Sequence, residues 1–214
     1  VGTSFRQPEL TADVNGLGVL RILEAIRLHS PSTKFYQAGS TDMLHGNEED
    51  GPKDENSYMR PLSPYAAAKI FAYNLISIYR NAYGLYACCG ICTNHESERR
   101  GIRFVTKKIT DYVGRYRNGL TTDSLKLGFI DSMRDWTFAG DVVESMYKMM
   151  QLDKPTDLVI GSGVAHSVRE FAELSFKAAG YYLMWRGFGI NEKGYWMDEH
   201  DGIHIVVDLS LIHI

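Results

Sequence analysis

Residues 63–92, SPYAAAKIFAYNLISIYRNAYGLYACCGIC, predict a helix followed directly by a strand. Ser63 and Pro64 open the helix, because proline suits a first helical turn. An apolar stripe at helical spacing follows, formed by Ala68, Ala72, Leu75 and Tyr79. Gly84 is a natural C-terminal cap, so the apolar run 85–92 behind it is the predicted strand.

Alternating elements continue on both sides of this stretch. Upstream, we expect an irregular start, a helix within residues 15–30, a short strand at 34–40 and a loop at 47–64. Downstream, we expect a basic helix at 104–116, a helix at 141–151, a strand at 157–161 and a helix capped by Ser167 and Glu170 that runs to about Ala179. Near-continuous apolar strands alternating with helices predict the α/β class, with part of a doubly wound (Rossmann-like) parallel sheet.

Composition and charge exclude several classes of protein. The chain has 214 residues, 44% of them hydrophobic and 23% charged, which is ordinary for a globular protein and excludes disorder, collagen and a coiled coil. The net charge of -3 gives no overall field for a nucleic acid or an anionic membrane, and no apolar run reaches the length of a bilayer span. We therefore expect a soluble, cytoplasmic protein with neither a nucleic-acid partner nor a membrane partner.

The three cysteines, Cys88, Cys89 and Cys92, all lie in the strand predicted at 85–92. Neighbouring residues of a strand point to opposite faces, so these thiols cannot converge on one metal ion. We interpret them as buried reduced thiols, which suit a reducing cytosol, and we expect no metal site.

Tyr65 and Lys69 are four residues apart on the predicted helix and so share one face. A neighbouring ammonium favours phenolate and can lower the pKa of the tyrosine toward the working range of a base. Ser40, Thr41 and Asp42 follow the strand at 34–40, where the carboxyl ends of parallel strands face a ligand crevice. Taken alone, the pair could be coincidental and the Ser-Thr-Asp run simple turn chemistry.

Five cations lie within ten residues of an otherwise acidic chain: Arg99, Arg100, Arg103, Lys107 and Lys108. Such a concentration suits the capture of phosphate groups. A solvated helix face or a small nucleic-acid patch would have the same composition.

Together these residues resemble the extended short-chain dehydrogenase/reductase superfamily, and further motifs resemble one of its families, the GDP-mannose 4,6-dehydratases. The motifs are FYQAGSTD (35–42), SPYAAAK (63–69), TNHESERRGIRFVTKKI (93–109), MRDWTFAGDVVESM (133–146) and HSVREF (166–171). They occur in order, at near-family spacing, and the resemblance runs from about Val1 to Leu209.

The resemblance implies a lyase that uses NADP as a temporary store of hydride. Hydride leaves C4 of the mannose ring of GDP-mannose, water is lost across C5 and C6, and the hydride returns at C6 to give GDP-4-keto-6-deoxymannose. Tyr65 would be the base on the C4 hydroxyl, and Lys69 would hold the nicotinamide ribose and tune the tyrosine. Ser40 stands at the family's threonine, a mild change, since either hydroxyl can donate to a developing oxyanion.

Asp42 stands where the family has the glutamate that removes the C5 proton. The aspartate side chain is shorter by one methylene group, about 1 Å, and such a shift of the carboxylate can cost much of the rate. An extra residue, His45, follows it. The resemblance further implies that His95 and Arg100 contact the cofactor, and that Leu10 replaces a cofactor-contacting tyrosine. Nucleotide-sugar contacts are implied for Asn94, Lys108, Arg134 and Arg169.

For the domains, we expect residues 1–98 to form the later part of an NADP-binding Rossmann domain that carries the catalytic residues. Residues 99–208 would form an interleaved, smaller α/β part that binds the nucleotide sugar. The ending LSLIHI (209–214) resembles a translated sequencing adapter, with a genuine terminal strand as the alternative. No glycine-rich phosphate turn precedes the first helix, so we expect a gene fragment that is inactive alone, from a parent that forms a homo-oligomer.

Two other functions remain open from the sequence. One is a nucleotide-sugar epimerase or reductase of the same superfamily, which would keep Tyr65 and Lys69 but need no carboxylate at Asp42. The other is a non-catalytic module that binds a nucleotide sugar. The stretch from Tyr181 to Asp201 departs most from the family and receives no assignment.

Overall fold

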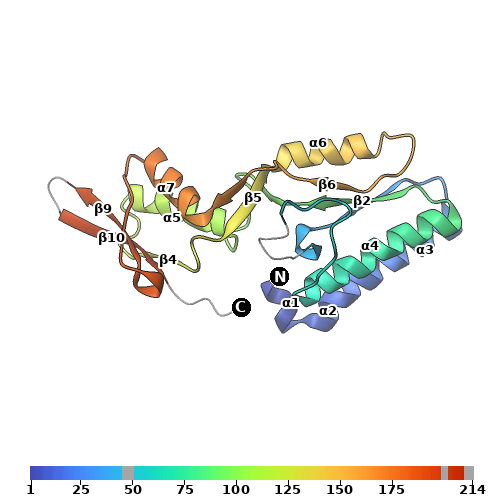
Figure 1. Ribbon diagram of the computed structural model, residues 1–214, viewed down its shortest axis with the longest axis horizontal. Helices are drawn as coiled ribbons and strands as arrows, with labels where there is room; N and C mark the ends of the chain where they lie inside the picture. The colour runs from blue at the N-terminus through green and yellow to red at the C-terminus, as the bar shows by residue number, and fades with distance from the viewer. Residues whose placement is uncertain (45–50, 199–201, 210–214) are drawn as a thin grey trace. The chain divides into compact units, whose positions relative to one another are not determined.

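The computed structural model describes residues 1–44, 51–198 and 202–209 (Figure 1). The chain divides into two compact units. The first unit contains Val1–His95 and Thr137–Gly163, and the second contains Glu96–Trp136 and the chain from Val164 onward. His45 and the tail Ser210–Ile214 lie outside the described residues.

A three-stranded parallel sheet forms the centre of the first unit, in the order β1 (Phe35–Ala38), β2 (Ala87–Cys92), β6 (Leu158–Ile160). Phe35 pairs with Ala87 and Gly90 pairs with Leu158. The helix α4 (Pro64–Tyr83) connects β1 to β2, and both strand pairs of the sheet are parallel. The predicted α/β class and parallel sheet are thus confirmed.

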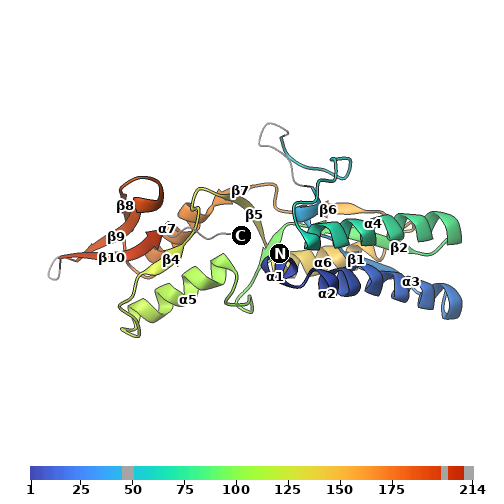
Figure 2. The ribbon, with the colours of Figure 1, turned by 90° about the horizontal axis from the view of Figure 1, so that it is seen from below.

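Helices cover both faces of this sheet (Figures 1 and 2). On one face, α3 (Gly18–His29) and α4 pack through a core that includes Leu23, Ile76 and Ala87. On the other face, α6 (Ala139–Met149) packs through Val142 and Met149. β2 is buried along its whole length, which explains its near-continuous apolar sequence.

The alternation of β2 also separates the thiols as predicted. Cys88 and Cys92 pack with α6, whereas Cys89 packs with Met43, Leu44 and Ile91 on the opposite face. All three cysteines are buried and free of disulfide bonds.

The caps of α4 are those that its sequence predicts. The Ser63 hydroxyl accepts a 3.0 Å hydrogen bond from the backbone N–H of Ala66, and Pro64 occupies the first turn. At the other end Gly84 adopts φ +65°, a left-handed conformation that favours glycine.

The prediction of an irregular start is wrong. Residues 2–17 are helical: α1 (Gly2–Arg6), α2 (Pro8–Ala12) and the π-helix η1 (Asp13–Leu17) lead directly into α3. Each piece has only five residues, too few to show an apolar period. Gly16 lets η1 approach α4 closely, since a Cβ there would lie 3.1 Å from the ring of Phe71.

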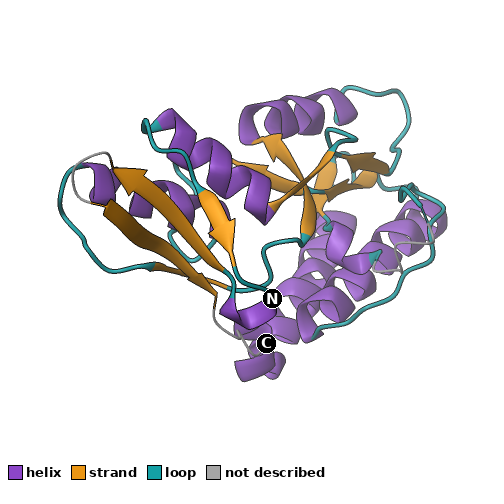
Figure 3. Ribbon diagram, turned by 60° about the vertical axis from the view of Figure 1, so that its left-hand side comes forward, coloured by secondary structure: helices purple, strands orange, loops and turns teal. Residues whose placement is uncertain are grey.

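In the second unit, α5 (Val105–Arg117) and α7 (Val168–Ala178) pack on a four-stranded sheet (Figure 3). The sheet has the order β4 (Leu125–Leu127), β10 (Gly202–Leu209), β9 (Lys193–Asp198), β8 (Met184–Arg186). The stretch left unassigned from the sequence forms β8, the 3-10 helix η4 (Gly189–Asn191) and β9. The other three described strands form a separate sheet that is not confined to the second unit, in the order β3 (Asn94–Glu96), β5 (Met133–Phe138), β7 (Ala165–Ser167).

The cap predicted for α7 is confirmed, because the Ser167 hydroxyl accepts a 3.0 Å hydrogen bond from the N–H of Glu170. None of the helices in the described ranges 1–44, 51–198 and 202–209 is both long and apolar enough to cross a bilayer.

Candidate active site

The site in the first unit begins where β1 ends. Gly39 follows the strand and must be glycine, because a Cβ there would lie 2.8 Å from the Cys89 sulfur and 3.0 Å from the Gly90 carbonyl oxygen. The next residue, Ser40, caps the 3-10 helix η2 (Thr41–Met43) by accepting a 3.2 Å hydrogen bond from the N–H of Asp42. The sheet and this short helix therefore fix Ser40 and Asp42 at the carboxyl end of β1.

Lys69 joins α4 to the same strand end. Its Nζ donates a 2.9 Å hydrogen bond to the carbonyl oxygen of Ala38, the last residue of β1. The same nitrogen lies 5.5 Å from the centroid of the Tyr65 ring, as expected for residues one helical turn apart. Four of the predicted site residues, Ser40, Asp42, Tyr65 and Lys69, are therefore brought together in one unit.

The tyrosine responds mainly to burial and to its acidic neighbour. Burial raises the pKa of Tyr65, the negative charge of Asp42 raises it further, and a side-chain hydrogen bond with Ser40 lowers it. The lowering of this pKa that Lys69 was expected to cause is not seen in the structure: the ammonium donates to the carbonyl oxygen of Ala38, and burial and Asp42 raise the pKa. Burial also lowers the pKa of Lys69 itself. The hydrogen bond with Ser40 is thus the contribution that favours the phenolate of Tyr65.

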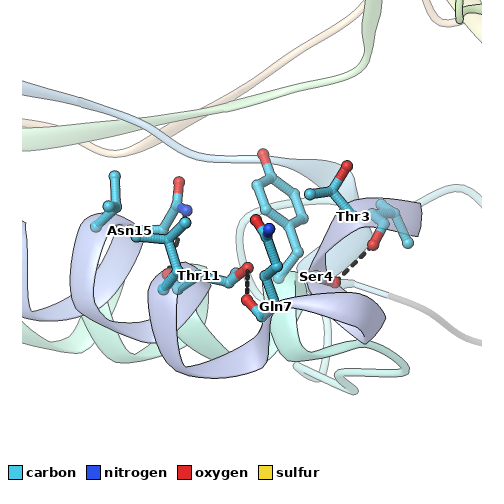
Figure 4. Close-up of a pocket in the computed structure, with 9 residues that line it drawn as sticks. Thr3, Ser4, Gln7, Thr11 and Asn15 are labelled. Atoms are coloured by element: carbon cyan, nitrogen blue, oxygen red, sulfur yellow. Dashed lines mark hydrogen bonds between the residues drawn. The ribbon is translucent and has the colours of Figure 1, made fainter.

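A pocket of about 260 Å³ lies beside Tyr65, lined by residues of α1, α2 and η1 (Figure 4). Its polar walls include Ser4, Gln7, Thr11 and Asn15. Ser4 and Thr11 are buried, and their hydroxyls donate to the carbonyl oxygens of Val1 and Gln7 at 2.6 and 2.7 Å. The hydroxyl oxygens keep lone pairs with which to accept bonds from a polar ligand.

Our sequence reasoning missed these pocket residues because it read residues 1–14 as irregular. Ser4, Gln7, Thr11 and Asn15 recur every three or four residues, which is the period of one helix face. That polar period is the signal that could have identified them.

His95 belongs to the first unit and is oriented by the backbone. Its Nδ1 lies 3.0 Å from the carbonyl oxygen of Thr93. A carbonyl only accepts, so Nδ1 carries a proton, and this hydrogen bond sets the direction in which Nε2 points. Asn94 precedes it in β3 and is half-buried.

The predicted cations of the second unit have very different surroundings. Arg100 lies against Glu96 and over the ring of Phe104, at 3.5 Å from the guanidinium carbon to the ring centroid. Phe104 is 47% exposed, and its ring covers one face of the guanidinium. Lys108 donates to the carbonyl of Lys126, and Arg134 donates to its neighbour Met133 at 2.6 Å.

Arg169 is held by two carboxylates. It donates to Asp131 at 2.8 Å from Nε and to Glu192 at 2.7 Å from Nη1, and Nη2 donates to both. Together they raise the pKa of Arg169, through hydrogen bonds with Glu192 first and Asp131 second. The three residues line a cavity of about 480 Å³ together with Phe129 and Phe188. This arrangement disfavours the predicted role of Arg169 as a phosphate anchor.

Comparison with known proteins gives one consistent family. A family model described as GDP-mannose 4,6 dehydratase matches residues 1–212. The GDP-mannose 4,6-dehydratase of Vibrio cholerae is 48% identical over 196 residues, 91% of this chain and 52% of that protein. Human GDP-mannose 4,6 dehydratase is 45% identical over 212 residues, 98% of this chain and 56% of that protein. The chain thus spans about half the length of the curated relatives it matches.

Solved structures agree on the fold. RMD from Pseudomonas aeruginosa, complexed with NADPH, aligns with a TM-score of 0.84 at 22% identity, covering 100% of this chain and 65% of that one. The Thermus thermophilus UDP-glucose 4-epimerase complex with NAD aligns with a TM-score of 0.72 at 25% identity, covering 97% of this chain and 64% of that one. The first likeness shows the fold alone.

Proposed function

Because this chain belongs to the GDP-mannose 4,6-dehydratase family, we propose that the protein dehydrates GDP-mannose to GDP-4-keto-6-deoxymannose, with NADP as its cofactor. The observation that carries the proposal is the grouping of Ser40, Asp42 and Tyr65 at the carboxyl end of β1, with Lys69 bonded to the last residue of that strand. Ligands bind at this end of the strands in doubly wound sheets.

The donor set at this strand end fits the nicotinamide ribose of NADP. An ammonium has three N–H donors, and the bond to Ala38 uses one of those on Lys69. Nε2 of His95 and the guanidinium of Arg100 would hold other parts of the cofactor. When bound, NADP+ supplies an acceptor for the hydride of the sugar C4 and a donor that returns it at C6.

Tyr65 would take the proton of the C4 hydroxyl as hydride leaves C4. Its raised pKa keeps the phenol protonated at neutral pH, so only a small phenolate fraction acts as the base. The side-chain hydrogen bond with Ser40 lowers the pKa of Tyr65 and so favours that fraction.

Asp42 would take the C5 proton, which the C4 ketone acidifies, and would pass a proton to the C6 hydroxyl as it leaves as water. This assignment makes the side-chain length of Asp42 a determinant of rate.

For the GDP part, we propose Asn94, Lys108 and Arg134 as contacts of the nucleotide sugar, on the family resemblance of their motifs. Arg169 is removed from this set, because carboxylates already engage all three of its nitrogens. The first unit would be the NADP-binding part and the second unit the nucleotide-sugar part.

The protein would act in the cytosol as a homo-oligomer. The three buried free thiols support a reducing compartment. Large exposed apolar side chains on neighbouring helices, Val14, Leu17, Phe71 and Ile78, support burial against a second copy. Phe71→Glu should then shift the assembled protein toward the monomer in light scattering.

The test is a chimera in which this chain replaces the matching residues of the Vibrio cholerae enzyme. Incubated with NADP+ and GDP-mannose deuterated at C4, the chimera should release a 4-keto-6-deoxy product with deuterium at C6. An epimerase would return the label to C4 without loss of water. A chimera with a cooperative melting transition and no dehydrated product would contradict the proposal, and the unaltered Vibrio enzyme is the positive control.

A further inference from the structure

Arg100 is held from two sides, and both contacts come from its own loop. The aromatic ring of Phe104 covers one face of the guanidinium at 3.5 Å. The carboxylate oxygen Oε2 of Glu96 lies 3.2 Å from Nε at the inner edge. The arginine side chain is only 19% exposed, so these two contacts leave it little freedom to turn.

The carboxylate that holds Arg100 is itself held. Thr106 is 4% exposed and donates its hydroxyl to Glu96 Oε2 at 2.5 Å. Thr106 lies in the first turn of α5, where the helix dipole also favours a negative charge. The chain Thr106 to Glu96 to Arg100 is therefore anchored at a helix end.

The loop between Glu96 and Thr106 contains two tight turns. The N–H of Arg100 donates to the carbonyl of Ser97 at 3.0 Å, and the N–H of Phe104 donates to the carbonyl of Gly101 at 3.0 Å. These bonds set the backbone from which Arg100 projects, independently of its side-chain contacts.

The N–H groups of Arg100 that have no partner among the described residues suit an oxyanion. Among the described residues, Glu96 is the only acceptor within ion-pair distance of Arg100, and it faces Nε. Nε is buried, yet it makes no hydrogen bond of good geometry with any described group. The two terminal amino groups make no bond to the described protein, in contrast to those of Arg169. Paired N–H groups of a fixed guanidinium match two oxygens of a phosphate.

We propose that Glu96 and Thr106 are positioning residues that fix the guanidinium of Arg100 for the phosphate groups of the cofactor. The proposal rests on the proposed function, which assigns Arg100 to NADP. Glu96 supplies the charge that orients Arg100, and Thr106 keeps that carboxylate in place. Neither side chain needs to touch the ligand.

The first experiment measures NADP+ affinity of the chimera by titration calorimetry, without GDP-mannose. Glu96→Gln and Thr106→Val should each weaken binding by about tenfold, a loss of about 1.4 kcal/mol. At saturating NADP+ the kcat of both variants should stay within about twofold of the unaltered chimera. Thr106→Ser keeps the hydroxyl and should restore the affinity, which a role in packing alone would not predict.

Glu98→Gln is the matched control, since Glu98 is an exposed carboxylate on the same loop, and it should leave the affinity unchanged. Equal affinity of Glu96→Gln, Thr106→Val and the unaltered chimera would overturn the proposal. A chimera that binds NADP+ but does not dehydrate GDP-mannose would contradict the proposed function and leave this test intact.

A second experiment uses the 214-residue chain itself, with inorganic pyrophosphate as the probe and the arginine Nε–H NMR signals as the readout. The Arg100 signal should move during the titration and should stop moving in Glu96→Gln. The proposal would also be overturned if the Arg100 signal did not shift with pyrophosphate in the unaltered chain, or if it shifted equally in Glu96→Gln.

Discussion

At the carboxyl end of β1, backbone atoms hold the polar side chains, whereas around Arg169 in the second unit charged side chains hold one another. Lys69 is tied to a carbonyl oxygen and Ser40 to an N–H, so their remaining donors and acceptors can serve a ligand. In Arg169, all three guanidinium nitrogens donate hydrogen bonds to Asp131 or Glu192. The difference teaches that the partners of a charged residue, more than its type, decide whether it serves chemistry or stability.

Replacement of Tyr65 should have the largest effect on activity. Tyr65→Phe removes the phenol oxygen but keeps the ring, so the chimera should lose about 10³-fold in kcat, within the range of a lost general base. Its melting temperature should stay nearly unchanged, because the packing of the ring is kept. Turnover within tenfold of the unaltered chimera would show that the pair with Lys69 is incidental.

Arg169 should show the opposite behaviour. Arg169→Met leaves two carboxylates without their partner and should lower the free energy of unfolding by about 2 kcal/mol. The KM for GDP-mannose of the folded chimera should not change. Urea unfolding and steady-state kinetics measure the two effects.

Arg21→Met is the control for that variant, because it breaks a solvent-exposed ion pair with Asp13 and should leave the free energy of unfolding nearly unchanged. A raised KM with unchanged stability in Arg169→Met would restore the role as a phosphate anchor.

The length of the Asp42 side chain can be tested by adding one methylene group. If the short carboxylate limits proton removal at C5, Asp42→Glu should raise the kcat of the chimera by about tenfold. Steady-state turnover of GDP-mannose measures this, with Asp54→Glu on an exposed loop as the control. A slower Asp42→Glu enzyme would mean that the turn after β1 is already adjusted to aspartate.

The smallest change is expected in the pH dependence of unfolding at acidic pH, through the ion pair of Asp131 with Arg169. The hydrogen bond with Arg169 lowers the pKa of Asp131. A lowered folded-state pKa stabilises the fold above the unfolded value, about 3.9, and this contribution is lost as pH falls through the folded value. Below about pH 4, the free energy of unfolding should therefore depend more on pH in the unaltered chain than in Arg169→Met. Equal slopes in acid denaturation would contradict the ion pair.

The first unit could largely be predicted from the sequence because its signals are local. Ser63, Gly84 and the stripe of α4 determine a helix from residues close in the chain. The parallel pairing of β1 with β2 follows from their apolar runs and the helix between them. The helices of residues 2–17 escaped because each is shorter than the window in which an apolar period shows.

The second unit could be predicted less well because its contacts are distant in sequence. The main partner of Arg169 is Glu192, in a stretch that no pattern assigned. The ring of Phe104 covers the guanidinium of Arg100, a contact that the spacing of residues in the sequence cannot reveal. Ser40, Asp42, Tyr65 and Lys69 lie together in the first unit as expected, but the bond from Lys69 to Ala38 joins residues 31 positions apart and could not be predicted from spacing. Nor does the sequence reveal the burial that raises the pKa of Tyr65.

The central claim is that Ser40, Asp42 and Tyr65 form one electrostatic group, and the pKa of Tyr65 tests it most directly. It can be measured in the 214-residue chain by NMR titration of tyrosine labelled with ¹³C at Cζ. Burial and Asp42 should keep this pKa above 10.0, so Asp42→Asn should lower it and Ser40→Ala should raise it. A Tyr65 pKa that neither substitution moves would contradict the account.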